Sequence, residues 1–391
     1  MQNFMYNTPT QVFFGRGVEA QVGPQLAARG YKKIMLHYGG GSVKRTGLLD
    51  KVTASLKEAG VEWIEMGGVQ PNPKISFVRT CLEQCRKENI DCILAVGGGS
   101  AIDSAKAIAM GLANNRDPWE IITSGVSPDK TFPVATVLTI SAAGSEMSNS
   151  HVITNEELHM KRGLNTEMVR PVVSFLNPEN TFTVSPYQTS CGTVDIMMHT
   201  LERYLTLDED AVLTDRMAEA LLVSVKEAGP VALADPENYE ARSTLMWASS
   251  LSHNGLTGCG KTFGFTVHKI EHDFSGLFDH VAHGAGLAVA FPAWASYVCK
   301  DNVKKFAQLA VNVMGIPMDE ADPEKTAREG IAAIKEYFRS LGMPTTMAEL
   351  GIPESAYEAI ANLTTAGGTK LVPGFRQLSK EDLLAIYKLA E

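Results

Sequence analysis

The alternation of strand-like and helix-like segments in the first half of the chain is the feature that most narrows the possible folds. Short apolar, β-rich runs are separated by amphipathic helical patterns at 48–60, 75–90 and 100–113; the runs lie at 11–15, 33–38, 61–66, 91–96, 132–139 and 172–177. Parallel strands need a crossover connection of this kind between them. The sequence therefore predicts a doubly wound parallel sheet of the α/β class.

The pattern changes near residue 185, after Asn177, Pro178 and Glu179. The segments that follow have the helical period with few strand signals between them, at 189–206, 212–228, 239–256, 302–314, 326–341 and 380–390. We therefore expect two domains: a nucleotide-binding α/β domain over 1–183 and an all-α, metal-binding helical domain over 184–391.

Composition excludes several classes of protein. The 391 residues, 45% of them hydrophobic, are enough for two or three domains with their own cores. A net charge of −9 makes nucleic acid and anionic membranes poor partners. We find no signal peptide at the start and no membrane span. The six cysteines form no CxxC pair and are expected to be reduced, which predicts a cytoplasmic protein.

The strongest phosphate-binding signal follows the buried strand 91–96. Gly97, Gly98, Gly99 and Ser100 stand between this strand and a helix, so backbone amides and the positive end of the helix dipole converge on one point. That arrangement suits a pyrophosphate. The alternative is a tight turn whose glycines only relieve crowding, but three in succession exceed that need.

A second glycine turn follows the strand 33–38. Gly39, Gly40, Gly41 and Ser42 would lie at the same sheet edge as the first turn. A plain flexible turn is the alternative. Two such turns on one sheet favour a dinucleotide over a mononucleotide.

Five histidines and one aspartate gather in two windows with metal-ligand spacing. Asp195 and His199 lie one helical turn apart, and His268 and His272 repeat this spacing; His280 and His283 follow in the next loop. Imidazole and carboxylate ligands suit Fe(II) or Zn(II). A lone histidine is more often a hydrogen-bonded core or surface residue. We assign that role to the histidines that lack such partners, which are His37, His151, His159 and His253.

These residues together resemble the iron-containing (group III) alcohol dehydrogenases. The resemblance rests on GGGSxxDxxK at 97–106, which includes Asp103, on DxxxH at 195–199, and on the stretch from Ile270 to Gly284. It extends over nearly the whole chain. The segment Tyr38–Lys44 is similar to the butanol dehydrogenase and aldehyde reductase branch.

The resemblance implies a fold of the dehydroquinate synthase-like type, with one divalent metal in a cleft between the domains. It implies Asp195, His199, His268 and His283 as metal ligands, with Fe(II) as the expected metal and Zn(II) as the alternative. His272 would act near the substrate without holding metal. The positions expected at the family's cofactor site are Asp103, Thr139, Ser141, Ser145 and Lys161.

The fourth ligand is the one place where the chain departs from the family pattern. The stretch between His272 and His283 is one residue longer than expected, and His280 looks like the extra residue. Gly284 and the run 286–288 match the pattern after the ligand, so we choose His283 over His280.

The predicted reaction is hydride transfer between a nicotinamide cofactor and a primary alcohol or aldehyde, of the butanol and butanal kind, in a homodimer. A polyol or diol dehydrogenase of the same family would use the same residues. A lyase of the dehydroquinate synthase type would need several cationic residues, whereas the 251–285 region offers only Lys261 and Lys269. A non-catalytic nucleotide-binding module would bind no metal.

The turn after strand 33–38 also predicts the cofactor. Selection of NAD usually needs a carboxylate near the adenosine ribose, and the NAD-using relatives carry an aspartate early in this loop. Here the loop has no acid and is followed by Lys44 and Arg45. We predict a preference for NADP(H) over NAD(H), against which stands only Glu65 on the next strand.

Overall fold

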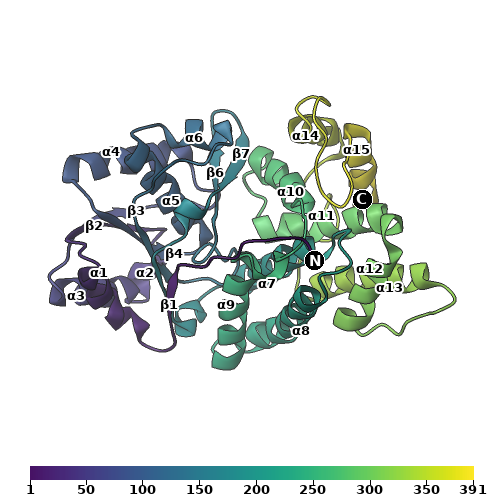
Figure 1. Ribbon diagram of the computed structural model, residues 1–391, viewed down its shortest axis with the longest axis horizontal. Coiled ribbons are helices and arrows are strands. Elements are labelled where there is room, and N and C mark those ends of the chain that lie inside the picture. The colour runs from purple at the N-terminus through teal and green to yellow at the C-terminus, as the bar shows by residue number, and fades with distance from the viewer. The chain divides into compact units, whose positions relative to one another are not determined.

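Six parallel strands form the sheet in the order β1-β8-β5-β4-β2-β3. Figure 1 labels β1, β2, β3 and β4 of this sheet. Their bounds are Gln11–Phe14 (β1), Lys33–Tyr38 (β2), Glu62–Gly67 (β3), Cys92–Gly97 (β4), Val134–Leu138 (β5) and Val173–Leu176 (β8). This computed structural model describes residues 1–391. The predicted doubly wound parallel sheet is confirmed, with strand ends shifted by a residue or two.

Helices cover both faces of the sheet. The residues of β2 alternate between them: Ile34 and Leu36 pack with α1 (Val22–Ala28) and α3 (Leu48–Glu58), and Met35 packs on the opposite face. That opposite face carries α4 (Ile75–Glu88), α5 (Gly99–Asn114) and α6 (Pro118–Ser124). Burial on both sides explains why the central strands are apolar throughout rather than alternating.

A two-stranded antiparallel hairpin, which the sequence analysis missed, follows β5 and precedes β8 in the sequence. It consists of β6 (Ser150–Asn155) and β7 (Met160–Asn165). The Asn155 side chain accepts hydrogen bonds from the backbone N–H groups of Glu157 and Leu158 in the connecting turn. The polar composition of β7 hides the strand pattern.

The second half of the chain is helical, as predicted. Its longer helices are α7 (Pro186–Tyr204), α8 (Val212–Ala234), α9 (Tyr239–His253), α10 (Thr266–Leu277), α11 (His283–Val298), α12 (Val303–Leu309), α13 (Pro323–Ser340), α14 (Tyr357–Thr364) and α15 (Lys380–Leu389). Shorter helical turns are α2 (Ser42–Arg45), Val18–Gln21, Glu167–Val169, Pro178–Thr181, Leu256–Gly258, Cys299–Asp301, Ala310–Met314 and Glu354–Ala356. None of the helices is long and apolar enough to cross a bilayer.

The chain divides into two compact units whose membership is not continuous in sequence. One comprises Asn7–Val184 with Glu237–Ser250, and the other comprises Met1–Tyr6, Ser185–Pro236 and Leu251–Glu391. Most of α9 therefore belongs with the sheet rather than with the predicted range 184–391. The reason is local: Met246 joins the core beneath α5, and the ring of Trp247 lies 6.1 Å from that of Phe14.

Candidate metal centre and nucleotide-binding turns

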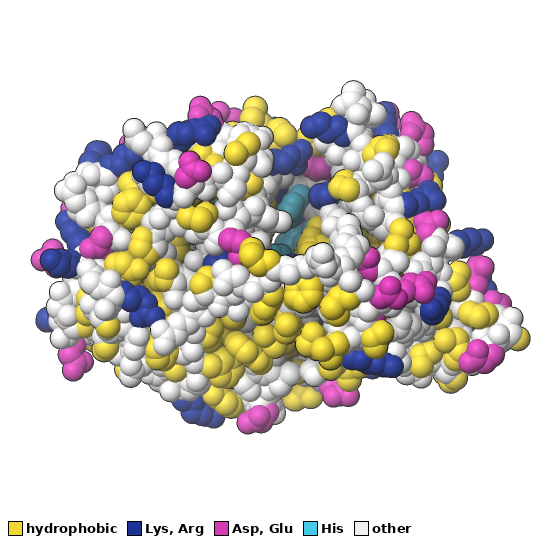
Figure 2. Space-filling model, viewed as in Figure 1, with side chains coloured by type: hydrophobic (Ala, Val, Ile, Leu, Met, Phe, Trp, Pro, Cys, Tyr) yellow, Lys and Arg dark blue, Asp and Glu magenta, His cyan; other side chains and the backbone are white.

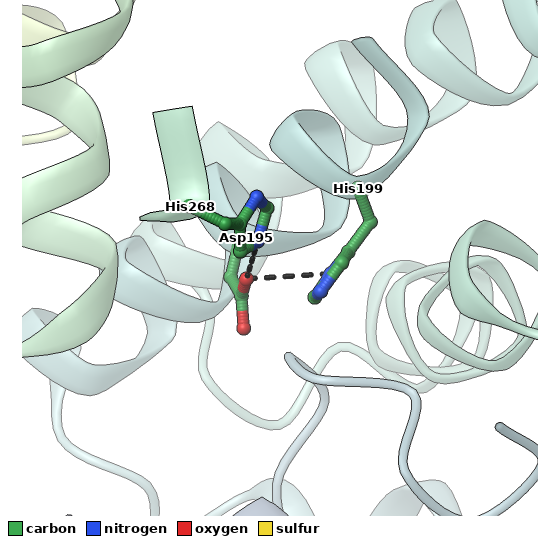
Figure 3. A group of neighbouring side chains, drawn as sticks. All are labelled: Asp195, His199 and His268. Atoms are coloured by element: carbon green, nitrogen blue, oxygen red, sulfur yellow. Dashed lines mark ion pairs between the residues drawn. The ribbon is translucent and has the colours of Figure 1, made fainter. Parts of the chain in front are cut away.

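Two buried histidines of the helical unit approach one carboxylate oxygen of the buried Asp195 (Figure 3). Asp195 and His199 lie on one face of α7, and His268 comes from the first turn of α10. The Asp195 Oδ1 atom is 3.3 Å from Nδ1 of His199 and 3.5 Å from Nε2 of His268. The i, i+4 spacing on α7 is what places two of these donors together.

His283 completes this group and His280 does not. His283 is the first residue of α11, and its Nε2 lies 3.6 Å from the same Asp195 oxygen. The Nε2 of His280 instead lies 3.3 Å from the carbonyl oxygen of Leu350. The structure thus brings together the four side chains named from the sequence and places the rival histidine elsewhere.

The donor atoms of this group fit a divalent cation. Asp195 Oδ1, His199 Nδ1 and His268 Nε2 are buried and make no hydrogen bond. Buried polar atoms almost always have a partner, so three such atoms around one point require an explanation. A carboxylate and imidazole nitrogens are ligands that Fe(II) and Zn(II) accept. A cation at this point would engage all three atoms at once.

The pKa values of His199 and His268 are shifted in opposite directions. Burial, and then the neighbouring His253, hold the pKa of His199 well below its usual value, which leaves its ring neutral. Burial also lowers the pKa of His268, but Glu202 and Asp195 outweigh it and raise the pKa to about 9. Glu202 and Asp195 therefore stabilise positive charge on the His268 ring, whereas burial disfavours it on the His199 ring.

Two further histidines border the group. The His272 ring centroid is 5.6 Å from that of His283 and 6.4 Å from that of His268. The ring of His253, which we expected to be structural and without partners, stands edge-on to His199 with centroids 4.0 Å apart. Sequence spacing gave no signal for His253, because α9 brings it in from a separate segment.

In the α/β unit, the turn at Gly97–Ser100 joins β4 to α5 as predicted. A Cβ atom on Gly98 would lie 2.1 Å from Cγ2 of Ile140, and one on Gly99 would lie 2.9 Å from Cβ of Ala143. Close packing against the 140–143 loop therefore requires these two glycines in any case. The crowding alternative therefore has a physical basis at this turn.

Asp103 and Ser145, both predicted to bind cofactor, are hydrogen-bonded to each other. The Ser145 hydroxyl donates to Asp103 Oδ1 at 2.6 Å, and the other Asp103 oxygen accepts from the N–H of Val152 at 2.9 Å. Lys106, one turn along α5, donates from a fully buried ammonium group to the carbonyl oxygens of Ser145, Ser148 and Ser150. These bonds hold the segment after β5 against α5.

The other predicted cofactor residues lie at the same region of the α/β unit. The N–H of Thr139 bonds to the carbonyl of Gly97, and the buried hydroxyl of Ser141 makes no hydrogen bond. The ammonium group of Lys161, on β7, donates to Asn72 Oδ1 at 3.1 Å. Two backbone N–H groups of the loop, from Ala142 and Gly144, bond to the Ser249 hydroxyl on α9; these bonds place α9 with this unit.

The turn Gly39–Ser42 follows β2 and leads into α2. A Cβ atom on Gly40 would meet nothing within 4 Å. The hydroxyl of Tyr38 donates to Glu65 on β3 at 2.9 Å, and the Lys44 ammonium lies 4.0 Å from the same carboxylate. The adjacent strand thus supplies the acid that the turn itself lacks.

Comparison with known proteins identifies the family of this chain. Residues 9–178 match the family described as iron-containing alcohol dehydrogenase, and residues 189–390 match the C-terminal part of that family. The chain belongs to the iron-containing alcohol dehydrogenase family. It is therefore an oxidoreductase, and the family implies a nicotinamide cofactor and an iron-type metal.

Named relatives cover almost the full length of the chain. It is 41% identical over 391 residues to NADH-dependent butanol dehydrogenase A of Clostridium acetobutylicum, covering 99% of each protein. It is 35% identical to the NADPH-dependent aldehyde reductase YqhD of Escherichia coli, covering 92% of each. The crystal structure of a Thermotoga maritima NADH-dependent butanol dehydrogenase A matches with a TM-score of 0.96 and 36% identity, over 100% of this chain and 99% of that one.

Sequence reasoning missed three charged residues that support the two sites of this alcohol dehydrogenase family member. Glu202 and Glu271 contact His268 and His283, and Lys106 anchors the segment after β5. Glu202 carries a signal in hindsight, because it lies on α7 three residues after His199 and so on a neighbouring part of the same face. Lys106 was visible in the motif but had no assigned role.

Charged side chains of both signs are interspersed on the face shown in Figure 2, where no continuous basic area is seen.

Proposed function

We propose that this chain is a metal-dependent alcohol dehydrogenase or aldehyde reductase that transfers hydride between NADP(H) and primary alcohols or aldehydes of the butanol and butanal kind. The observation that carries the proposal is the convergence of three imidazole nitrogens on one buried carboxylate oxygen. Family membership and the names of the relatives support the reaction class.

The residues that would hold the metal are Asp195, His199, His268 and His283, with Fe(II) as the expected ion and Zn(II) as the alternative. A divalent ion bound there supplies Lewis acidity, polarising a carbonyl oxygen and stabilising negative charge on it. The protein's part is to fix the four donors in place; of these, the His283 side chain is 27% exposed.

His272 is proposed to assist proton movement or substrate placement without holding metal. Its ring borders those of His268 and His283. An imidazole beside the metal group can accept a proton from a substrate oxygen, or donate one to it, through a water molecule.

The proposed cofactor contacts are the two glycine turns, Gly39–Ser42 and Gly97–Ser100, together with Thr139, Ser141 and Lys161. The open space beside Gly40 and the buried, unbonded hydroxyl of Ser141 support contact with a ligand. Asp103 and Ser145 would act through each other, by holding the segment after β5 in position.

NADP(H) preference is the part of the proposal that Glu65 opposes. The acid-free turn and the Lys44 ammonium favour a 2′-phosphate, whereas a carboxylate next to the ribose favours NAD. Glu65 is engaged by Tyr38 and Lys44, which lowers its capacity to repel a phosphate. The relatives include one named for NADPH and others named for NADH. Comparing kcat/KM for NADPH and NADH, in wild type and in Gly40→Asp, tests the preference; higher kcat/KM with NADH in wild type overturns it.

The reaction class is tested by NADPH oxidation with a panel of aldehydes, diols and polyols, using iron-loaded, zinc-loaded and metal-stripped protein. We expect turnover with short primary aldehydes that requires metal. Preference for a diol would shift the assignment to a polyol dehydrogenase. Equal activity of stripped protein would overturn the role of metal.

The lyase alternative loses one of its two candidate cations. The Lys261 side chain is 0% exposed and paired with Asp215.

We propose a cytoplasmic homodimer; light scattering of the purified enzyme tests the oligomeric state.

A further inference from the structure

Two buried glutamates contact the metal-site histidines on the side that faces away from Asp195. Glu202 of α7 and Glu271 of α10 have side chains that are 2% and 0% exposed. The Nδ1–H of His268 donates to Glu202, and the Nδ1–H of His283 donates to Glu271. Both rings thereby turn Nε2 towards Asp195 Oδ1.

Glu202 also fixes the helix that carries His268. The residue before α10, Phe265, has φ +50 and no side chain able to accept the free N–H groups of the first turn. Glu202 accepts them from another helix: its Oε1 is 2.6 Å from the N of Val267, and its Oε2 is 3.1 Å from the N of His268. One carboxylate on α7 therefore holds both the start of α10 and the ring of its metal ligand.

Glu271 can approach His283 because residue 286 of α11 is a glycine, which has no side chain. Gly286 lies one turn after His283 on α11, and a Cβ atom there would be 2.7 Å from Cγ of Glu271 and 3.2 Å from its Oε1. The glycine in α11 thus leaves room for the glutamate of α10 beside the ring of His283.

We propose that Glu202 and Glu271 are positioning residues that set the metal affinity of this site. This inference rests on the proposed function, since it concerns the same four ligands. A carboxylate that accepts the Nδ1 proton fixes the tautomer with a lone pair on Nε2, holds the ring orientation and makes Nε2 a stronger donor. His199 differs, because it presents Nδ1 to Asp195 and packs against His253.

The test measures Co²⁺ affinity of metal-free protein by chelator competition, in wild type, Glu202→Gln and Glu271→Gln. Each glutamine should weaken Co²⁺ binding by about 10–100-fold and shift the visible absorption of bound Co²⁺. In Glu202→Gln the amide NH₂ must face an N–H donor, because both oxygens of Glu202 accept from backbone N–H groups. The matched control is Glu219→Gln, a buried glutamate of the same unit that accepts from Tyr204, and its Co²⁺ affinity should equal that of wild type.

Gly286→Ala supplies an independent test should Glu271→Gln fail to fold, since the added methyl displaces Glu271 without changing any carboxylate. It should lower Co²⁺ affinity in the same direction as Glu271→Gln. Wild-type affinity in folded Glu271→Gln and Gly286→Ala would overturn the inference. A lower thermal midpoint of the metal-free protein with unchanged Co²⁺ affinity would do the same, because it would show a purely structural role.

His199→Ala separates this inference from the proposed function. If wild type binds no Co²⁺, or His199→Ala binds it as well as wild type, the proposed function fails and takes this inference with it. If His199→Ala loses Co²⁺ while both glutamine variants keep wild-type affinity, only the inference about the glutamates fails.

Discussion

The polar groups near the glycine turns and those of the helical unit differ in how far the protein itself satisfies them. In the α/β unit, Lys106 is surrounded by oxygen acceptors and Asp103 accepts from Ser145 and Val152. Around Asp195, by contrast, buried donor atoms face one another without a hydrogen bond. The first arrangement is complete as the protein folds. A cation would complete the second, so loss of a side chain should have different consequences in the two units.

The largest effect is expected from removing a ligand of the incomplete site. His199→Ala should lose metal and turnover together; loss of about 4 kcal/mol of charge stabilisation corresponds to about 10³-fold in rate. Metal analysis and kcat/KM on the same preparation check this. His283→Ala should behave similarly. His280→Ala should keep its metal, because the His280 ring lies against the carbonyl oxygen of Leu350 and not in the metal group. Retained metal in His283→Ala with loss in His280→Ala would reverse the choice of ligand.

The next largest effect is expected in the α/β unit, where the protein itself supplies the hydrogen-bond partners of the buried polar groups. Lys106→Met would leave the carbonyls of Ser145, Ser148 and Ser150 without their donor, so the free energy of unfolding of the α/β unit should fall by about 3 kcal/mol. Cofactor affinity should fall with it, while metal content stays near that of wild type. Urea unfolding, cofactor titration and metal analysis measure the three quantities. Lys51→Met, an exposed lysine of α3, is the control.

Loss of metal in Lys106→Met would show that the two sites depend on one another.

Acid should destabilise the α/β unit through a buried neutral histidine. Burial lowers the pKa of His37 to about 4, and its Nε2 lies 2.9 Å from the Ser104 hydroxyl. Because the folded pKa lies below the unfolded value, the stabilisation is complete above about pH 6.5 and is lost as the pH falls towards 4. The expected loss is about 3 kcal/mol. Hydrogen exchange of β2 amides at pH 7 and pH 4.5 measures it.

His37→Gln should flatten this pH dependence; an unchanged slope would remove His37 as its cause.

The smallest effect concerns the histidine that borders the metal group. His272→Ala should lower kcat by about 10²-fold, as expected for loss of a group that moves a proton, with metal content near that of wild type. Metal analysis and kcat with a short aldehyde check both parts. Loss of metal in this variant would make His272 a ligand and enlarge the incomplete site.

Much of the fold and the candidate site was accessible from the sequence because it rests on local periodicity. The crossovers between apolar runs predict the parallel sheet, and i, i+4 spacing predicts that Asp195 and His199 share a helix face. The family resemblance added His283 as the fourth ligand. The hairpin β6–β7 was missed because the residues of Met160–Asn165 are mostly polar.

What only the tertiary structure decided are the partners that come from distant segments. Glu202 meets His268 across 66 residues of sequence, and Lys106 meets Ser148 across 42. The rings of His253 and His199 meet although they come from two different helices, α9 and α7. Periodicity reports which face of its own element a residue occupies, but it carries no information on which other element packs there. The sequence by itself therefore determined most of the elements and the pairing of Asp195 with His199 on one helix face, whereas packing decided which charged side chains contact the histidines.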